Sequence, residues 1–203
     1  MSSSPVRRPR GEYRKSHSRR KEIVEAAVEV FATVGYNKGS LREIADRVGL
    51  SQAGLLHHFA SKELLAQAVL TWRDEDALAR LGTPLPTGAD LLRRLVDLTA
   101  YNERNPALIE LHVVLSGEAT SVEHPLHAYL VGRYAEVFDL IRAAFEQARE
   151  RGELQADVDA DSATRTVISL MDGLQLQWLL NRDGVDMAAD VRRYLRSLLA
   201  VPL

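Results

Sequence analysis

The pattern of apolar and polar positions predicts a helix near the start of the chain. Apolar side chains recur at steps of three and four residues, at Ile23, Ala26, Ala27, Val30, Phe31 and Val34. This spacing keeps one face of a helix apolar. The run ends at Gly35, and glycine is common just past a helix end because it adopts a left-handed backbone without strain. We therefore expect a first helix that buries one face.

Two shorter helices are predicted between residues 40 and 59. Ser40 to Glu43 form a capping box, in which the serine accepts from the amide three residues on and the glutamate reaches back to the serine amide. The helix that follows has the apolar stripe Leu41, Ile44, Ala45 and Val48. Gly49 ends it, and Ser51 can cap a third helix through about Phe59. Two short helices joined by a turn and packed on a longer one describe a helix-turn-helix.

The rest of the chain continues the helical pattern. We expect further helices at about 62–81, 88–104, 106–120, 125–151, 161–181 and 187–200. Glycine and proline separate the earlier ones, and Asp159 or Asp161 and Asp186 lie where helix starts are expected. No alternating run is long enough for a sheet, so the sequence predicts an all-α fold of about nine helices.

Charge divides the chain into two parts. The net charge of the 203 residues is −2, but residues 1–62 contain 12 Lys and Arg against 6 Asp and Glu, whereas the remainder contains 14 against 22. A basic amino-terminal part on an acidic body indicates that one end meets a polyanion, with nucleic acid the leading candidate. The chain has no cysteine, which excludes disulfides and thiolate metal sites. Without a signal-peptide core or a long apolar segment, we expect a cytoplasmic protein that does not enter a membrane.

Residues 18–65 resemble the amino-terminal domain of the tetracycline-repressor (TetR) family of bacterial transcription regulators. The motif positions are Phe31, Gly35-Tyr36, Ser40, Ile44-Ala45, Gly49, Ser51, Gly54-Leu55-Leu56-His57-His58-Phe59 and Lys62-Glu63-Leu64. The resemblance implies a helix-turn-helix DNA-binding domain over 17–62 and a helical regulatory domain over 63–203, which dimerises and binds a small molecule. One departure is Leu56, which stands where the family often has a tyrosine.

The predicted DNA-binding residues are Ser40, Arg42, Ser51, Gln52, Ala53, Gly54, Leu56, His57, His58 and Lys62. Free amides and the positive end of the helix dipole favour phosphate where the third helix begins. The amide of Gln52 can pair with adenine, and Ala53 can touch a thymine methyl group. Leu56 either touches a thymine methyl group or packs inward. Arg42, His57 and Lys62 suit phosphates, whereas a polar contact inside the domain is favoured over a DNA contact for His58.

Residues 1–16 and the remaining histidines carry weaker signals. The segment 1–16 lacks apolar periodicity and is rich in Ser, Pro and Arg, so we expect a disordered basic arm that either contacts DNA or is a solvated tail. His57 and His58 diverge by about 100 degrees on a helix and cannot easily hold one ion. His124 and His127 have a spacing that could hold a metal ion on a helix, but Pro125 places His124 before the predicted helix start. A capping or surface role is therefore favoured for these histidines over a metal site. We expect no metal site and no cofactor.

The regulatory domain is expected to contain an effector pocket and a homodimer interface. Pocket candidates mix aromatic and polar side chains: Trp72, Tyr101, Asn102, His112, Tyr134, Phe138, Met171, Gln175 and Trp178. The helix at 161–181 is apolar on more than one face, since Ile168, Leu176 and Leu179 lie off its main stripe, which indicates a partner helix. Interface candidates are Leu170, Leu174, Gln177, Val191, Tyr194, Leu195 and Leu198. Residues 171–178 resemble, less closely, the choline-responsive BetI-like branch of the family.

The resemblance implies a homodimer that binds a palindromic operator and represses transcription until an unknown small molecule releases it. An activator, or a regulator without a ligand, would share these residues. An enzyme is not expected, because no nucleophile elbow, phosphate-cradling glycine loop or His-Glu-x-x-His motif occurs. A helical protein-interaction module would explain the amphipathic helices, but not the basic, capped helix-turn-helix.

Overall fold

The computed structural model describes residues 10–202, with side chains described from His17 onward. Within this part of the chain there are nine α-helices and no multi-residue strand. They are α1 (Arg10–Lys38), α2 (Leu41–Arg47), α3 (Gln52–His58), α4 (Lys62–Leu81), α5 (Ala89–Glu103), α6 (Pro106–Glu118), α7 (His127–Glu150), α8 (Ala160–Leu180) and α9 (Met187–Leu198). The all-α prediction is confirmed. Over the described residues, no helix combines the length and the apolar character needed to span a lipid bilayer.

The first helix is longer than the sequence pattern indicated. It begins at Arg10, so the expectation of disorder is wrong for residues 10–16, while residues 1–9 lie outside the described residues. Helix propagation is far easier than nucleation, and the packed segment from Ile23 onward supplies the nucleus. The backbone leaves helical geometry at Gly35, with φ of 77°, at the residue where the apolar run ended.

Side-chain caps set most of the later helix starts. Ser61, Asp159 and Asp186 accept hydrogen bonds from amides three residues on, at 3.1, 2.8 and 2.8 Å. Asp159, rather than Asp161, is therefore the cap of α8. The start of α7 is delayed to His127 because the Nδ1 atom of His124 accepts from the amide of Leu126 at 3.2 Å, within a turn.

The capping box at α2 is only half formed. Ser40 Oγ accepts from the amide of Glu43 at 3.4 Å, as predicted. The Glu43 carboxylate does not reach back, because it accepts instead from Arg47 at 2.8 Å, one helical turn away. The serine therefore caps the helix without the reciprocal bond.

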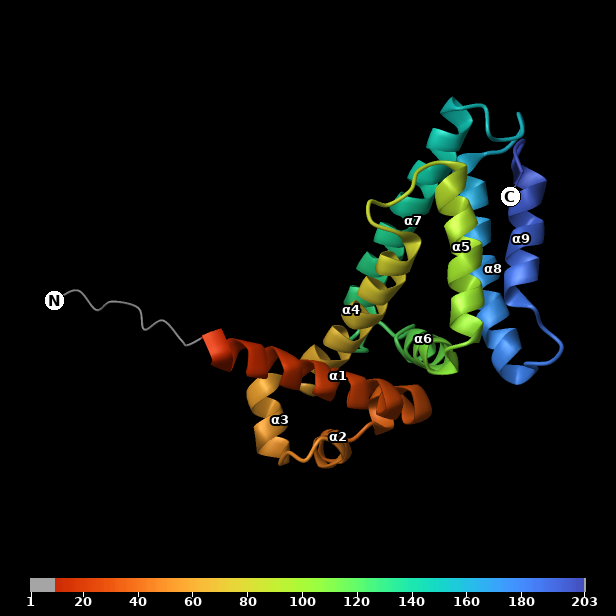
Figure 1. Cartoon of the computed structure of the whole chain (residues 1–203). Helices are drawn as coiled ribbons and strands as arrows, with labels where there is room; N and C mark the ends of the chain where they lie inside the picture. Colours follow the sequence, from red (N-terminus) through yellow and green to blue (C-terminus); the bar gives the residue numbers. More distant parts are fainter. Residues whose placement is uncertain (1–9, 203) are drawn as a thin grey trace.

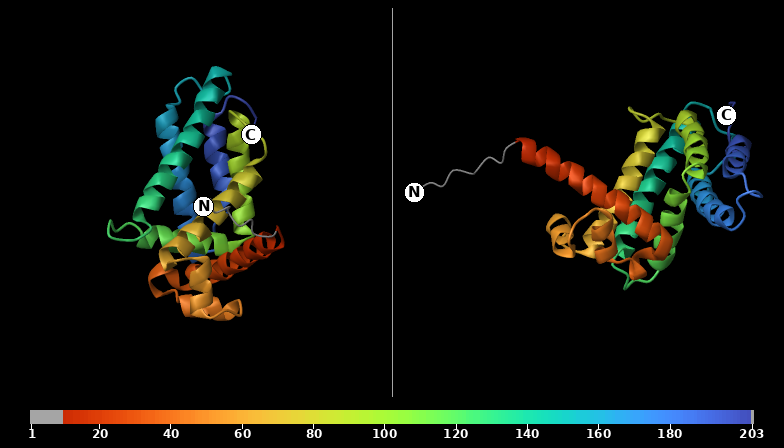
Figure 2. Two further views of the ribbon diagram at one scale, coloured as in Figure 1. Left: turned by 90° about the vertical axis from the view of Figure 1, so that its left-hand side faces the viewer. Right: turned by 60° about the horizontal axis from the view of Figure 1, so that its bottom comes forward.

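The helices form a small lower unit and a larger upper one (Figure 1). α1 lies across the base of the molecule, with α2 and α3 beneath it. α4, α5, α7, α8 and α9 stand upright, and α6 crosses between the two units against α1. In the two further views α2 and α3 stay at the end of the molecule remote from α9 (Figure 2). This arrangement presents the helix-turn-helix to solvent.

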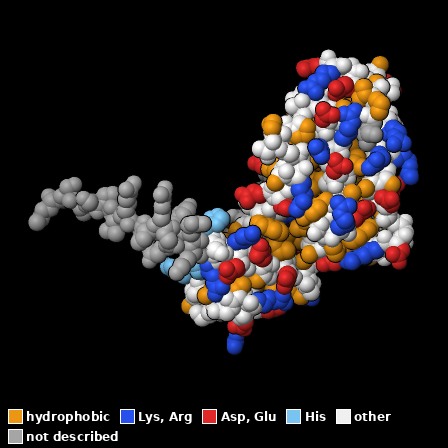
Figure 3. Space-filling model, viewed as in Figure 1, with side chains coloured by type: hydrophobic (Ala, Val, Ile, Leu, Met, Phe, Trp, Pro, Cys, Tyr) orange, Lys and Arg blue, Asp and Glu red, His pale blue; other side chains and the backbone are white. Residues whose placement is uncertain are grey.

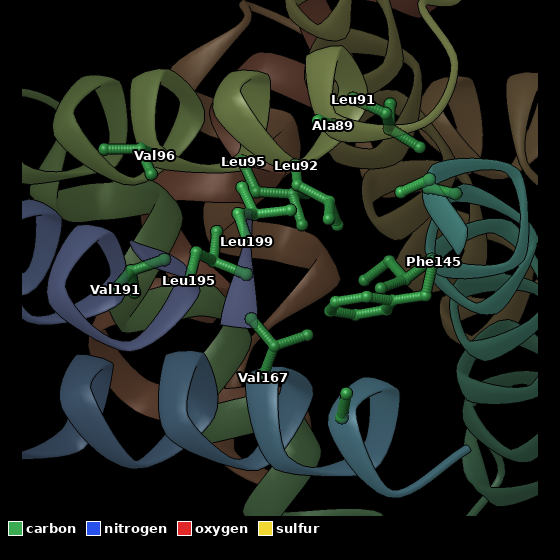
Figure 4. Close-up of a cluster of buried hydrophobic side chains, with 14 of the residues drawn as sticks. Ala89, Leu91, Leu92, Leu95, Val96, Phe145, Val167, Val191, Leu195 and Leu199 are labelled. Carbon is green, nitrogen blue, oxygen red and sulfur yellow. The ribbon is translucent and has the colours of Figure 1, made fainter. Parts of the chain in front are cut away.

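Two apolar cores correspond to these units. The amino-terminal core includes Ile23, Phe31, Ile44 and Leu55, all fully buried, but it also takes in the first half of α4 and several residues of α6 and α7. The predicted domain boundary at 62/63 therefore falls short, because α4 belongs to this core as far as Leu70. The carboxy-terminal core joins α5, α7, α8 and α9 around Phe145 and Val167 (Figure 4).

A carboxylate joins the two units where α6 meets α1. Glu118, the last residue of α6, accepts from the backbone amide of Tyr36 at 2.6 Å and from that of Asn37 at 3.4 Å. Glycine is required at position 35 by its backbone, whose φ of 77° and ψ of 179° other residues rarely adopt, and a Cβ atom there would also displace the Glu118 carboxylate, because it would lie 2.5 Å from Oε1. Lys62, the first residue of α4, donates to the Asn37 carbonyl at 3.2 Å. α1, α4 and α6 therefore meet at one polar joint.

Candidate nucleic-acid interface and interior cavity

The amino-terminal end of α3 is exposed and ready for a polar partner. Ser51 caps the helix by accepting from the amide of Gly54 at 3.1 Å. Ser51, Gln52 and Ala53 are all solvent-exposed, while Leu55 is fully buried in the amino-terminal core. The helix is thus fixed through one face and presents the opposite face, with its first amides and the Gln52 amide, to solvent.

Gly54 and Leu56 are half-buried neighbours on this helix. A Cβ atom on Gly54 would meet only Ser51 Oγ at 3.4 Å and Leu50 at 3.6 Å, which are ordinary contacts, so the fold itself does not require glycine there. Close approach of another backbone remains a reason for glycine at this position. Leu56 is not fully withdrawn from the surface, so a contact with a thymine methyl group stays a prediction.

The basic side chains near α2 and α3 fall into two classes. Arg42 is exposed and forms no ion pair with another residue of the 17–202 segment. Arg47, by contrast, is paired with Glu29 at 2.7 Å and Glu43 at 2.8 Å. In Figure 3, Lys and Arg side chains reach the surface of this lower unit with acidic side chains among them. Arg42 is therefore better placed than Arg47 to contact phosphate.

Lys62 and the paired histidines are more constrained than the sequence suggested. The Lys62 ammonium lies 4.6 Å from the Tyr36 ring centroid besides its bond to Asn37, and burial lowers its pKa. His57 is exposed, whereas His58 is half-buried and its carbonyl accepts from Arg20. Burial and the charges of His57 and of the nearby arginines lower the pKa of His58. DNA contacts by these residues stay predictions.

The upper unit contains a partly open cavity of about 250 Å³. Its walls come from α4, α5, α6, α7 and α8. Away from the lower unit the lining is apolar, with Leu78, Leu81, Leu95, Leu98, Leu140 and Ile141. Arg73 and Tyr134 precede the apolar lining residues of α4 and α7 by one to two turns, and both helices run away from α1 (Figure 1). His112 of α6 and Asp172 of α8 lie beside Tyr134, to which Asp172 is hydrogen-bonded. The cavity thus has an apolar end and a polar end, and the polar end is nearest the helix-turn-helix.

Asp172 organises one side of the polar end. Its carboxylate accepts from His112 Nε2 at 3.0 Å and from the Tyr134 hydroxyl at 2.7 Å. A carboxylate only accepts, so Nε2 of His112 holds the proton, and Nδ1 faces the Ser116 hydroxyl at 3.4 Å. These bonds connect α6, α7 and α8.

Burial controls the protonation of this cluster. Burial, together with the charge of Arg73, lowers the pKa of His112 to about 4, so its imidazole is neutral near pH 7. Burial, with Asp172 adding to it, raises the pKa of Tyr134 to about 12. Burial alone would raise the pKa of Asp172, but the bonds from His112 and Tyr134 hold it below its usual value. Asp172 is therefore an anion flanked by neutral donors.

Two arginines occupy the other side of the polar end. Arg133 Nε lies 2.8 Å from both carboxylate oxygens of Asp74. Arg73 is 8% exposed, donates from Nε to the Leu108 carbonyl at 3.3 Å and lies 3.6 Å from Asp74. Burial, and then the charge of Arg133, lowers the pKa of Arg73 to about 10. Its terminal nitrogens donate no hydrogen bond to any residue of the described segment.

Five of the nine predicted pocket residues line the cavity, namely Asn102, His112, Tyr134, Met171 and Gln175. The other four do not line it. Trp72 packs on the amino-terminal core, and Trp178 is buried in the carboxy-terminal core. Tyr101 lies under the Arg80 guanidinium at 3.2 Å, and Phe138 lines an adjoining outer hollow between α7 and α8, which shares Tyr134 and Asp172 with the cavity.

Sequence reasoning missed the charged residues of the cavity, Arg73, Asp74, Arg133 and Asp172. A signal for Arg73 was present, because it continues the apolar stripe of Val69 and Leu70 along one face of α4. A charge at a core position of an apolar stripe indicates a buried polar site. Pairing of such residues across helices, however, is visible only in three dimensions.

Three predicted dimer residues were also wrong. Leu174, Val191 and Leu195 are at most 5% exposed within a single chain, and Leu195 lies between α5 and α8 (Figure 4). They cannot contact a second subunit. Leu170, Tyr194 and Leu198 are half-buried and Gln177 is exposed, so these four stay predictions. The outer face of α8 instead exposes Leu176 and Leu180, at 49% and 80%.

Known proteins resemble both units. The family model "Bacterial regulatory proteins, tetR family" matches residues 23–69, and "BetI-type transcriptional repressor, C-terminal" matches residues 88–200. The transcriptional regulator UidR of Escherichia coli (strain K12) is 26% identical over 156 residues, covering 76% of this chain and 79% of UidR. The regulator TtgR of Pseudomonas putida is 29% identical over 195 residues, covering 87% of each chain.

The fold also matches solved structures. A transcriptional regulator from Saccharomonospora viridis in complex with choline superposes with a TM-score of 0.75 at 21% identity, covering 91% of this chain and 100% of that one. At this identity the match concerns the fold alone.

Proposed function

The chain belongs to the TetR family of bacterial regulatory proteins, and is thus a DNA-binding transcriptional regulator; from this membership we propose that it represses transcription as a homodimer on a palindromic operator. We propose further that a small molecule in the interior cavity releases it. One observation carries the second part: the cavity is lined by α4 and α6, the two helices that also meet α1 at the polar joint.

The operator contact is proposed for the exposed end of α3. Gln52 supplies a bidentate amide for a base edge, and Arg42 supplies a charge for phosphate. Their exposure, and the fixed orientation of α3 through buried Leu55, support this assignment. Two copies related by a twofold axis would read half-sites separated by about one turn of DNA or a multiple of it.

The dimer contact is proposed for the outer face of α8 together with α9. Leu176 and Leu180 are one turn apart and exposed, with Gln177 beside them. Large apolar side chains gathered on one face are typical of protein interfaces. An isologous contact through this face would hold the two helix-turn-helix units at a fixed separation.

Release requires a path from the cavity to α3. α4 starts at Lys62 in the polar joint and reaches the cavity at Arg73, while α6 reaches the cavity at His112 and the joint at Glu118. A ligand that alters the packing at the polar end therefore acts on both helices. A coupling of about 1–3 kcal/mol between ligand and DNA changes affinity by about 5- to 150-fold.

The test is selection of bound duplexes from a random-sequence pool by the full-length protein, followed by titration of the recovered sequence and a scrambled duplex at two salt concentrations. We expect an inverted repeat, bound more tightly than the scrambled duplex and more weakly at high salt. Recovery of no common sequence, or equal binding to both duplexes, would contradict the proposal.

A further inference from the structure

We propose that the cavity takes an uncharged, largely apolar molecule with one oxygen-bearing head, oriented with that head toward the helix-turn-helix. This inference rests on the proposed function, because it names the chemical class of the effector. It follows from the division of the cavity into an apolar and a polar end, and from the charges at the polar end.

The size of the cavity limits the ligand. A cavity of about 250 Å³ takes a small organic molecule and not a peptide or a nucleotide. Leucine and isoleucine side chains from α4, α5 and α7 surround most of this space. The body of the ligand is therefore apolar, and only its head meets polar groups.

The charges around the head already balance. Arg73 and Arg133 face Asp74 and Asp172 within one connected cluster, and His112 is neutral. Two further carboxylates, Asp76 and Glu136, line the cavity outside this cluster. Asp76 is paired with Arg80 at 2.8 Å, and Glu136 is solvent-exposed. An added cation or anion would lack a free counter-charge, and an unpaired buried charge is costly. A neutral head avoids this cost.

Hydrogen-bonding groups at the polar end suit an oxygen atom. Nη1 of buried Arg73 lies 3.6 Å from Asp74 Oδ1, but Nη2 has no hydrogen-bond acceptor among the described residues, so it can donate to a hydroxyl or carbonyl oxygen. Asn102 is also buried at the cavity wall, and no bond of its side chain to the described residues is formed. A hydroxyl head can both accept from Arg73 and donate to a carboxylate or amide oxygen.

A trimethylammonium head fits this cavity poorly. Such groups are bound by cages of several aromatic rings. The only aromatic rings among the described lining residues are His112 and Tyr134, and both are hydrogen-bonded to Asp172. Trp72, Tyr101 and Trp178, which could have built a cage, pack elsewhere.

The experiment compares, by isothermal titration calorimetry on the full-length protein, probes that share a 4-propylphenyl body. They are 4-propylphenol, 4-propyltoluene, 4-propylbenzoate and N,N,N-trimethyl-4-propylanilinium. The two charged probes are larger than the phenol, so 4-propylbenzamide and 4-propyl-tert-butylbenzene, which match them in size without the charge, are the controls, and each charged probe should bind more weakly than its neutral match. We expect the phenol to bind about tenfold or more tightly than either charged probe, and about three- to tenfold more tightly than the toluene. Equal or tighter binding of a charged probe, or binding of none of the four, overturns the inference.

Two variants test the charge balance with opposite signs. Asp172→Asn removes a negative charge with little change of shape, so binding of the benzoate should increase relative to the phenol. Arg73→Met removes a positive charge and retains the aliphatic stem, so binding of the anilinium should increase. Circular dichroism checks that each variant folds. If one variant does not fold, the other variant and the wild-type affinities test the charge balance. An unchanged order of affinities in a folded variant contradicts the inference.

A third variant establishes where the probe binds. Leu98→Trp fills the apolar end and should abolish phenol binding, whereas Val131→Trp, on the exposed face of α7, is the matched control. Retained binding in Leu98→Trp places the phenol elsewhere and overturns the inference. If the phenol binds in the cavity but does not weaken DNA binding, the proposed release is contradicted and the inferred class of ligand is not. The experiment therefore distinguishes failure of the ligand class from failure of the release mechanism.

Discussion

The face formed by α2 and α3 takes its exposed residues from the single stretch 40–58, whereas the cavity takes its lining from five helices between Arg73 and Gln175. In the first region each side chain is placed by its own helix and by a local cap, such as Ser51. In the second, several polar groups are joined across helices, as Asp172 is to His112 and Arg133 is to Asp74. The proposed DNA-binding surface therefore depends mainly on neighbouring residues in the chain, whereas the proposed ligand site depends on contacts between distant ones.

The prediction with the largest expected effect concerns the dependence of the amino-terminal core on α6, a helix distant in the sequence. Leu111 of α6 is fully buried in the amino-terminal core, so Leu111→Ala should destabilise the protein by about 2–5 kcal/mol. Urea unfolding followed by circular dichroism measures the change. Val122→Ala, at a 74% exposed position, is the control and should change stability by less than about 0.5 kcal/mol. A small effect of Leu111→Ala would mean that this core does not depend on α6.

The second test concerns the protonation of the distributed site. The pKa of His112 is lowered to about 4 in the folded protein, against about 6.5 when unfolded, so the unfolded state binds more protons between these values. Stability should therefore be complete above about pH 6.5 and fall by up to about 3 kcal/mol as pH decreases toward 4. His112→Gln should reduce this dependence when urea midpoints are compared at about pH 7 and 5. The same slope in both proteins would contradict a neutral, buried His112.

The third test separates base reading from phosphate binding on the local surface. Gln52→Ala should weaken binding to the selected operator by about 1–3 kcal/mol and relax preference at one base pair. Arg42→Ala should weaken binding to all duplexes and reduce the salt slope by about one. Arg47→Ala, whose charge is already paired with two glutamates, is the matched control. Fluorescence anisotropy measures all three, and a larger loss for Arg47→Ala than for Arg42→Ala would contradict the assignment.

The smallest test compares two caps on the same surface. Ser51→Ala should destabilise the protein by about 1 kcal/mol, the usual value for an N-cap. Ser40→Ala should cost less, because Ser40 Oγ lies 3.4 Å from its amide, whereas Ser51 Oγ lies 3.1 Å from its own. Thermal unfolding gives both values. The reverse order would show that neighbouring contacts, not the caps, stabilise these helices.

The sequence predicts the elements more fully than the site. Apolar periodicity and caps depend on residues close together in the chain, and the predicted range 62–81 coincides with α4. The α7 start was two residues off because the His124 ring, and not the proline, determines it. Trp178 and Val191 were misplaced because periodicity identifies an apolar face without saying whether a second helix, a cavity or another subunit covers it.

The ion pairs at the polar end of the cavity could not be predicted from the sequence. Arg133 and Asp74 are 59 residues apart and meet only because α7 and α4 form two walls of the same cavity. A single sequence holds no measure of such distances. Asp172 looked like an ordinary helix residue until His112 and Tyr134 were found to converge on it.

The joint at Glu118 also bears on how this protein can diverge. Its carboxylate is held by the backbone amides of Tyr36 and Asn37, and every residue except proline has such an amide. Mutational drift at positions 36 and 37 can therefore proceed without losing the bond. Position 35 is constrained differently, because its φ of 77° and ψ of 179° are adopted almost only by glycine, whatever residue stands at 118. Among descendants of this sequence, glycine at 35 should therefore persist even where the acidic residue at 118 is lost.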